Sequence, residues 1–253
     1  MEEREEKIFE VYGQAGSLLS QYRSGVLPRA LTILPMLSNC RALLEAMLPA
    51  QWSTAGVSAM TKLFVNSKNE SLQHFLRCVL YPAVCESLST RKRLDTHLYE
   101  ALRTALFKPQ EFFKGIVIPL CTDKATLLRE AELVAGILAK KRIPAMHAAA
   151  AMMRLTEKRH KNITGTFLAV FLKKKPILPF QALDALFSFF YLEKDNAERM
   201  PVLWHQNLLL FVRAYFAQLS DEQRALLLNL VSVQRHKDIS PEIEAAAREC
   251  LVQ

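Results

Sequence analysis

The sequence is poor in glycine and proline and contains no long apolar run. Its 253 residues include only 7 glycines and 11 prolines, while 51% are hydrophobic. This composition excludes a disordered chain and is typical of a globular helical protein with a substantial core. No apolar stretch approaches the length of about 18 residues that suggests a membrane span, and the acidic EEREE after Met1 is unlike a secretory leader. We therefore expect neither a membrane span nor a secretory signal.

The sequence also lacks paired cysteines and the short motifs of common catalytic sites. Its five cysteines form no CxxC pair, and their odd number leaves one unpaired in any disulfide scheme, so we expect free thiols in a reducing compartment. It contains no G-x-S-x-G, Walker GK[ST], HExxH or G-x-G-x-x-G string. We expect a protein that is not an enzyme and needs no cofactor.

Three weaker patterns are better explained by structure than by chemistry. His74, Cys78 and Cys85 would share a face of an unbroken helix, as metal ligands do, but Pro82 interrupts that helix and no fourth ligand is near. We therefore predict no metal site. Trp204-His205 is expected to hold a hydrogen-bonded structural histidine. The GxxG string at residues 13–16 interrupts a helical pattern and lacks the surrounding elements of a KH domain.

Apolar residues recur at the three-to-four spacing of amphipathic helices along almost the whole chain. The N-terminal caps expected for these helices include Ser53, Asp95 and the capping box Ser220–Gln223. The predicted helices span residues 2–22, 28–35, 41–48, 54–66, 71–88, 94–108, 109–121, 126–142, 144–159, 163–175, 179–192, 201–219, 221–233 and 241–251.

The fold class predicted from these helices is all-α. Hairpin dipeptides and sustained period-2 alternation are missing, so strands are absent or trivial. About a dozen antiparallel helices joined by short turns favour an irregular helical-repeat solenoid, HEAT- or TPR-like, over a closed bundle. Prolines open helices at positions 109, 144, 179 and 201, of which the first three are 35 residues apart. We expect residues 1–253 to form one domain.

The segment 107–121, FKPQEFFKGIVIPLC, is predicted to be a short and largely buried helix. Pro109 can open this helix, because the missing N–H is one that the first turn leaves unused. Pro119 is expected where the helix ends or bends. Lys108 and Lys114 would lie at its margin.

Positive charge is concentrated in the middle of the chain. The formal net charge is +8, but residues 91–175 contain 18 Lys and Arg against 7 Asp and Glu, so the rest of the chain is net negative. Cations near helix C-termini can simply complement the helix dipole. Four clusters of basic residues within this segment favour phosphate binding instead. They are Arg91–Arg93, Lys140–Arg142, Lys158–Lys161 and Lys173–Lys175. The candidate RNA-binding residues are Arg91, Lys92, Arg93, Lys108, Lys114, Lys140, Lys141, Arg142, Lys158, Arg159, Lys161, Lys173, Lys174 and Lys175.

The order of the helices predicts two basic edges. If successive helices are antiparallel, alternate turns share an edge, which places Lys140–Arg142 and Lys173–Lys175 together with Lys108. Arg91–Arg93 and Lys158–Lys161 would then lie on the other edge with Lys124. Such cations would contact phosphates, which position a nucleic acid without reading its sequence.

Five long strings carry a resemblance to a known family: YRSGVLPRALTILP, RLDTHLYEALRTALFKPQEFFKGIVIPLC, LREAELVAGILAKKRIPAMHAAAAMM, LPFQALDALFSFF and MPVLWHQNLLLFVRAY. They resemble the bystin family, also called essential nuclear protein, from about Ile8 to about Ile243. The resemblance implies an α-helical repeat fold and a non-catalytic role in assembly of the small (40S) ribosomal subunit. It also implies a nucleolar and nuclear location, with passage to the cytoplasm on pre-40S particles.

The resemblance implies partners as well. These are pre-ribosomal RNA, the KH-domain ribosomal protein of the subunit head and the low-temperature-viability assembly factor, without a membrane or a small-molecule substrate. The sequence departs from the family in two respects: the usual long charged N-terminal extension is absent, and SGVLPRALT stands where the family reads SGKLPKAFK. Only Arg29 remains of three cations there, so RNA contact through that segment is not expected.

Two other classes of function stay open at this point. A peptide-binding solenoid adaptor unconnected with ribosomes would capture partners in a salt-insensitive way and give no RNA crosslinks. An enzyme on helical repeats, such as a DNA glycosylase, would need a carboxylate and aromatic side chains at a concave basic face. Asp184 and Trp204 are the notable candidates for that role.

Overall fold

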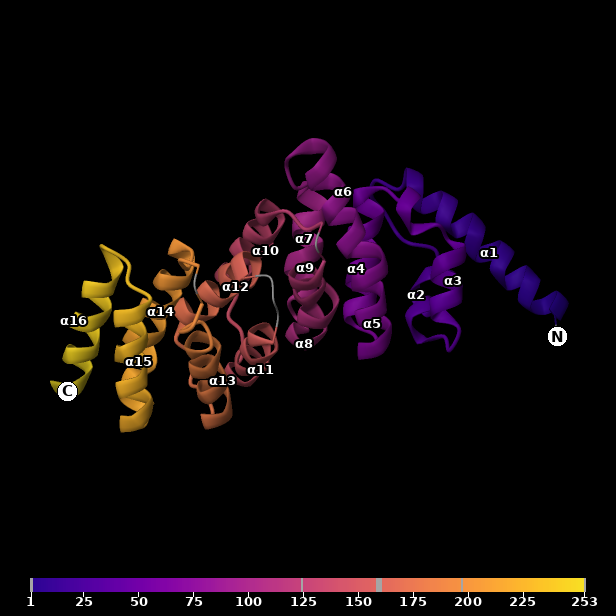
Figure 1. Ribbon diagram of the computed structural model, residues 1–253. Coiled ribbons are helices and arrows are strands. Elements are labelled where there is room, and N and C mark those ends of the chain that lie inside the picture. Colours follow the sequence, from indigo (N-terminus) through magenta and orange to yellow (C-terminus); the bar gives the residue numbers. More distant parts are fainter. Residues whose placement is uncertain (1, 124, 158–160, 197, 253) are drawn as a thin grey trace. The chain divides into compact units, whose positions relative to one another are not determined.

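The computed structural model describes residues 2–123, 125–157, 161–196 and 198–252, which are almost entirely helical (Figure 1). No strand occurs in these ranges, as the sequence predicts. Within the same ranges, no helix combines the length and the apolar character that crossing a bilayer requires. The chain divides into two compact units, which comprise residues Met1–Pro119 (unit 1) and Leu120–Gln253 (unit 2).

Unit 1 begins with a long helix, which is followed by shorter helices and two π-helical turns. Its first elements are α1 (Glu2–Gln21), α2 (Arg29–Ile33), η1 (Leu34–Met36), α3 (Cys40–Ala46), η2 (Pro49–Gln51), α4 (Thr54–Val65) and α5 (Asn69–Phe75). They are followed by η3 (Leu76–Leu80), α6 (Tyr81–Arg91), α7 (Thr96–Ala105), α8 (Pro109–Phe112) and η4 (Phe113–Val117). The helix α9 (Ile118–Thr122) spans the division between the units.

The predicted caps of unit 1 are confirmed. The Ser53 hydroxyl accepts a hydrogen bond from the N–H of Gly56 at 3.0 Å and so caps α4. The same hydroxyl lies 2.5 Å from the carbonyl oxygen of Tyr22, which joins the start of α4 to the end of α1. Asp95 accepts from the N–H of His97 at 2.8 Å and caps α7. Local sequence therefore determines where these two helices begin.

Pro82 and Pro119 each lie near the start of an α-helix that directly follows a π-helical turn. The turn η3 precedes Pro82 and the turn η4 precedes Pro119, and the helix continues past each proline. A proline ring clashes with the carbonyl four residues earlier, and the wider π turn relieves this clash. At Pro119, where the sequence predicts that the helix ends or bends, a π-helical turn precedes the proline and the helix continues to Thr122.

The two π turns pack against each other in the core of unit 1. A Cβ added at Gly115 would lie 2.7 Å from the Cβ of Leu76, so only glycine permits this approach. Beside it, Phe64 of α4 stacks on Phe75 of α5 with ring centroids 4.3 Å apart. Gly16 has a similar role in α1, because an added Cβ would collide with the backbone carbonyl of Met47. The GxxG string is therefore part of a packed helix and not of a loop.

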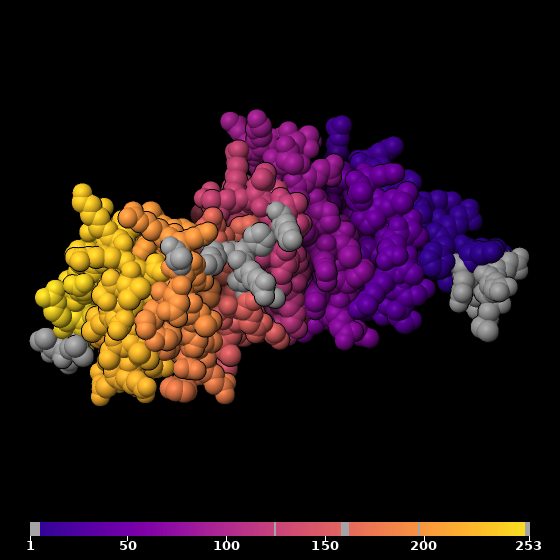
Figure 2. Space-filling model, viewed as in Figure 1, coloured from indigo at the N-terminus to yellow at the C-terminus, as the bar shows by residue number. Residues whose placement is uncertain are grey.

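The helices of unit 2 are similar in length and contact one another in two series. The elements are α10 (Leu128–Lys140), α11 (Ala145–Thr156), α12 (Lys161–Lys174), α13 (Phe180–Tyr191), α14 (Val202–Tyr215), η5 (Phe216–Gln218), α15 (Asp221–Val233) and α16 (Ile239–Val252). The helices α10, α12, α14 and α16 pack in succession, and so do α11, α13 and α15. The colours of unit 2 in Figure 2 accordingly follow chain order across its surface.

Aromatic side chains form the centre of unit 2, and the start of α15 is capped as predicted. Phe190 of α13 packs against Trp204 and Phe211 of α14, with ring centroids 5.8 and 5.4 Å apart. Ser220 accepts from the N–H of Gln223, and the Gln223 side chain accepts from the N–H of Ser220, both at 3.2 Å. The predicted capping box of α15 is therefore confirmed.

Candidate nucleic-acid interface

Two basic turns of unit 2 lie side by side, and we call them the paired basic turns. The first comprises residues 139–146, between α10 and α11, and the second comprises residues 173–180, between α12 and α13. The ammonium group of Lys174 donates hydrogen bonds to the carbonyl of Ala139 at 2.7 Å and to that of Lys141 at 2.9 Å. These bonds bring together two clusters that are more than 30 residues apart in the sequence.

Within the paired basic turns, Lys174 has a structural role. Its nitrogen bonds to carbonyls at the C-terminus of α10, where a cation also complements the helix dipole. Burial lowers the pKa of its ammonium group below the usual value. The helix-dipole explanation considered for all the clusters thus applies to this lysine.

The neighbouring cations project into solvent. Lys140, Arg142, Lys173 and Lys175 are all exposed, while Lys141 is half-buried. Lys175 adopts a left-handed conformation, with φ of 48°, which ends α12 and turns the chain into an extended segment. Four exposed cations therefore stand on two turns that a fifth one joins.

The candidate cations of unit 1 divide in the same way. Lys108 donates to the carbonyl of Ser67 at 2.6 Å and to the side-chain oxygen of Asn69 at 2.9 Å, so it ties the turn between α4 and α5 to the start of α8. Lys114 is exposed on η4. The predicted edge that combined Lys108 with the clusters of unit 2 stays a prediction.

The cluster Arg91–Arg93 begins at the last residue of α6. Arg91 forms an exposed ion pair with Asp95, with 3.5 Å between nitrogen and oxygen. Lys92 is left-handed, with φ of 54°, and its N–H bonds to the carbonyl of Leu88. Arg93 is exposed, and its carbonyl accepts from the hydroxyl of Ser87 at 3.3 Å.

Lys124, Lys158 and Arg159 lie outside the described residues, and of Lys161 the structure describes only the position at the start of α12. The second predicted edge therefore also stays a prediction.

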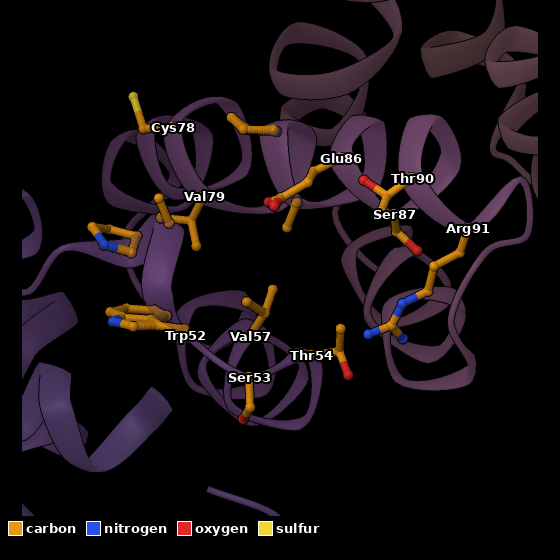
Figure 3. Close-up of a pocket in the computed structure, with 14 residues that line it drawn as sticks. Trp52, Ser53, Thr54, Val57, Cys78, Val79, Glu86, Ser87, Thr90 and Arg91 are labelled. Atoms are coloured by element: carbon orange, nitrogen blue, oxygen red, sulfur yellow. The ribbon is translucent and has the colours of Figure 1, made fainter. Parts of the chain in front are cut away.

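A cavity of about 410 Å³ lies in unit 1, between the start of α4 and the face of α6 (Figure 3). Trp52, Val57 and Val79 line one part of it. The Arg91 guanidinium extends towards Thr54 at the other part, and the Glu86 carboxylate points into the space (Figure 3). The lining therefore combines apolar, cationic and anionic side chains.

Cys78 lines this cavity and a neighbouring one of about 290 Å³. Its sulfur lies 3.7 Å from Nδ1 of His74. Desolvation raises the pKa of Cys78 and lowers the pKa of His74, so both groups are held neutral and the thiol is not activated as a nucleophile. The ranges that the structure describes contain no group of three His, Cys, Asp or Glu side chains placed to hold a metal ion.

Trp204 and Asp184, the residues considered for an enzymatic site, differ in exposure: Trp204 is buried, whereas Asp184 is exposed. Trp204 and His205 are buried in α14, and the His205 ring packs against Trp204 and His236 with centroids 4.9 and 5.1 Å apart. Burial and then the nearby His236 lower the pKa of His205. Its Nδ1 has no hydrogen-bond partner among the described residues, so the expected bond is not made there. Asp184 is exposed and accepts from the Gln223 side chain at 3.0 Å.

Sequence reasoning missed one property of the paired basic turns, which is the exposure of apolar side chains beside the cations. Met146, Ile177 and Phe180 look like core residues in a hydropathy pattern, yet all three are exposed. The available signal was their position, since each lies within two residues of a proline that opens a helix.

Comparisons with known proteins give a consistent result. A family model described as Bystin matches residues 1–250. The chain is 42% identical to the Bystin of Monosiga brevicollis over 238 residues, which covers 94% of this chain and 58% of that protein. It is 41% identical to the Bystin of Homo sapiens over 244 residues, covering 96% and 56% respectively. For the Bystin of Drosophila melanogaster the identity is 37% over 254 residues, covering 99% and 58%. The chain thus spans somewhat more than half the length of these relatives.

Proposed function

The chain belongs to the bystin family, and from this premise we propose that it is a non-catalytic assembly factor of the small ribosomal subunit that binds pre-ribosomal RNA. The chain matches somewhat more than half the length of these relatives. We therefore propose, for this chain itself, both the role in assembly and the partners. The paired basic turns are the surface through which it holds RNA.

The observation that supports this proposal is the solvent exposure of four cations on the paired basic turns. Lys174 donates hydrogen bonds to two carbonyl groups, whereas Lys140, Arg142, Lys173 and Lys175 are exposed. No Asp or Glu occurs between positions 132 and 157 or between 157 and 184, so the surrounding sequence offers no acidic side chain to neutralise them. A group of exposed cations without acidic residues nearby in the sequence suits a polyanion with regularly spaced phosphates.

The scaffold, the protein partners and the cellular location that we propose are those that the resemblance to the bystin family implies. The two series of packed helices in unit 2 support an α-helical repeat, solenoid-like scaffold, on which protein partners bind beside RNA. We include among these partners the KH-domain protein of the subunit head and the low-temperature-viability factor. The protein would then act in the nucleus and nucleolus and accompany pre-40S particles to the cytoplasm.

Depletion of the protein in its own cells tests the cellular role. We expect small-subunit rRNA precursors to accumulate and the mature subunit to decline. Normal maturation of these precursors would refute the role in subunit assembly.

A matched pair of charge reversals tests the RNA-binding surface. Arg142→Glu with Lys175→Glu should weaken RNA binding and reduce the slope of log affinity against log salt, at about 0.7 per lost phosphate contact on a single strand. The control is Arg235→Glu with Lys237→Glu, which reverses two exposed cations in the turn before α16. Equal effects of the two pairs on the fluorescence anisotropy of labelled RNA would show that the basic turns are not the binding surface.

The cavity beside α6 favours one alternative, which is a peptide-binding adaptor unconnected with ribosomes. Its lining combines Trp52 with Arg91 and Glu86, as a pocket for an amphipathic segment would. Such an adaptor would retain its partners at high salt and give no RNA crosslinks on purified pre-ribosomes, whereas the RNA-binding factor gives such crosslinks.

A further inference from the structure

The paired basic turns present apolar side chains to solvent next to their cations. Ile177 is 87% exposed, and Phe180 and Met146 are each 72% exposed. Scattered exposed apolar residues are ordinary on protein surfaces. Here, however, three of them stand on two adjoining turns that also carry four exposed cations.

These side chains are held outward by a well-anchored backbone. Lys174 fixes the start of the second turn, and the Tyr215 hydroxyl donates to the carbonyl of Pro176 at 2.9 Å. Leu178 is buried. In this extended segment the side chains of Lys175, Ile177 and Pro179 are therefore exposed, while those at 176 and 178 face the protein. Ile177 is exposed because its neighbours Pro176 and Leu178 are held against the protein, by the hydrogen bond from Tyr215 and by burial.

The first turn repeats this arrangement 35 residues earlier. Lys140, Arg142, Pro144 and Met146 are exposed, and the residues between them are at least half-buried. Both turns thus place cations at the end of one helix, then a proline, then an exposed apolar residue in the first turn of the next helix. The helices that follow, α11 and α13, also pack against each other.

We propose that the paired basic turns bind an unpaired RNA segment, with phosphates on the exposed cations and bases stacked on Phe180 and packed against Ile177 and Met146. This inference rests on the proposed function and specifies its substrate class. Single-stranded nucleic acid is commonly held by a basic surface with aromatic side chains on which bases stack. A duplex keeps its bases stacked inside, so these apolar side chains would gain no base contact from it.

RNA fits this surface better than an acidic peptide or an anionic membrane does. Each of the apolar side chains lies within two residues of a proline. Both cavities described above, which could take a peptide side chain, lie in unit 1. A membrane-binding helix presents a continuous apolar stripe, whereas α11 and α13 each expose a large apolar residue only near their ends.

Anisotropy titrations with Phe180→Ala test the inference. The probes are a labelled oligouridylate of about 12 nucleotides and an RNA duplex of about 12 base pairs, lengths within the site sizes of single-strand binders. Base stacking on an aromatic side chain is worth about 1–3 kcal/mol, so Phe180→Ala should weaken oligouridylate binding about fivefold or more. Binding to the duplex should stay unchanged.

The matched control is Leu192→Ala. Leu192 is 80% exposed at the other end of α13, away from the basic turns, and its removal should affect neither probe. Circular dichroism checks that both variants are folded. As a second readout, 5-iodouridine in the oligonucleotide should photocrosslink to a peptide that contains Phe180.

The outcomes separate this inference from the proposed function. If Phe180→Ala leaves oligouridylate binding unchanged, or weakens both probes equally, base stacking is refuted while RNA binding stands. If Arg142→Glu with Lys175→Glu changes neither titration, the RNA-binding surface itself is wrong. Tighter binding to anionic vesicles or to an acidic peptide than to oligouridylate, lost in Phe180→Ala, would also overturn the inference.

Discussion

Replacement of Lys174 by methionine should destabilise unit 2 by about 1.5–3 kcal/mol, which is the net contribution of a hydrogen bond to a charged group. Lys174 makes two such bonds, to the carbonyls of Ala139 and Lys141, at 2.7 and 2.9 Å. Their sum is not expected, because burial lowers the pKa of the ammonium group and so indicates a desolvation cost. Methionine keeps most of the aliphatic packing and removes the charge and the donors.

Lys173→Met provides the matched control. Lys173 is exposed one residue away, so its replacement should change the free energy of unfolding by no more than about 0.5 kcal/mol. It should instead weaken RNA binding, because this lysine is one of the proposed phosphate contacts. The two adjacent lysines are thus expected to affect different properties.

Urea denaturation followed by tryptophan fluorescence measures the difference. The chain has two tryptophans, and Trp204 lies in unit 2 while Trp52 lies in unit 1, so the Trp52→Phe background reports on unit 2 alone. Equal stability of Lys174→Met and Lys173→Met in this background would refute the division into structural and phosphate-binding cations.

Three further predictions concern packing, pH and capping. Gly115→Ala should cost about 1–3 kcal/mol of unit 1 stability in urea denaturation, because its Cβ would lie 2.7 Å from that of Leu76; an unchanged midpoint would contradict this packing. Burial raises the pKa of Tyr215 from 10.0 to about 12, so the stability it confers is complete below pH 10 and is lost as pH rises through 12. The loss approaches about 3 kcal/mol for this shift, and Tyr215→Phe, which also lacks the bond to Pro176, should not show it in alkaline denaturation. Ser220→Ala should lower the melting temperature through a loss of about 1 kcal/mol, whereas Ser220→Asp, which can still cap, should not.

The helices and their caps could be predicted because their causes are local. Apolar periodicity and the caps Ser53, Asp95 and Ser220 depend on residues within a few positions of each other. The prolines at 144 and 179 likewise mark where α11 and α13 begin. The same local reasoning predicted an end or a bend of the helix at Pro119 but not the π-helical turn that precedes this proline.

The roles of individual cations could not be predicted, since they depend on which carbonyl groups lie nearby in space. Lys108 reaches a turn that is about 40 residues away in sequence, and Lys174 reaches one that is more than 30 residues away. In the sequence these two lysines look the same as Lys173 and Lys175. The exposure of Ile177 and Phe180 was hidden for the same reason, because hydropathy does not tell which side of an anchored loop faces solvent.

The sequence by itself determined the helical class, the position of the positive charge and the family of this protein, because propensity, composition and family strings are properties of neighbouring residues. Only the tertiary structure decided that Lys174 joins two basic turns, on which Lys140, Arg142, Lys173 and Lys175 are exposed. That distinction arises from packing between α10 and α12, and contacts between distant segments carry no local signature in the chain.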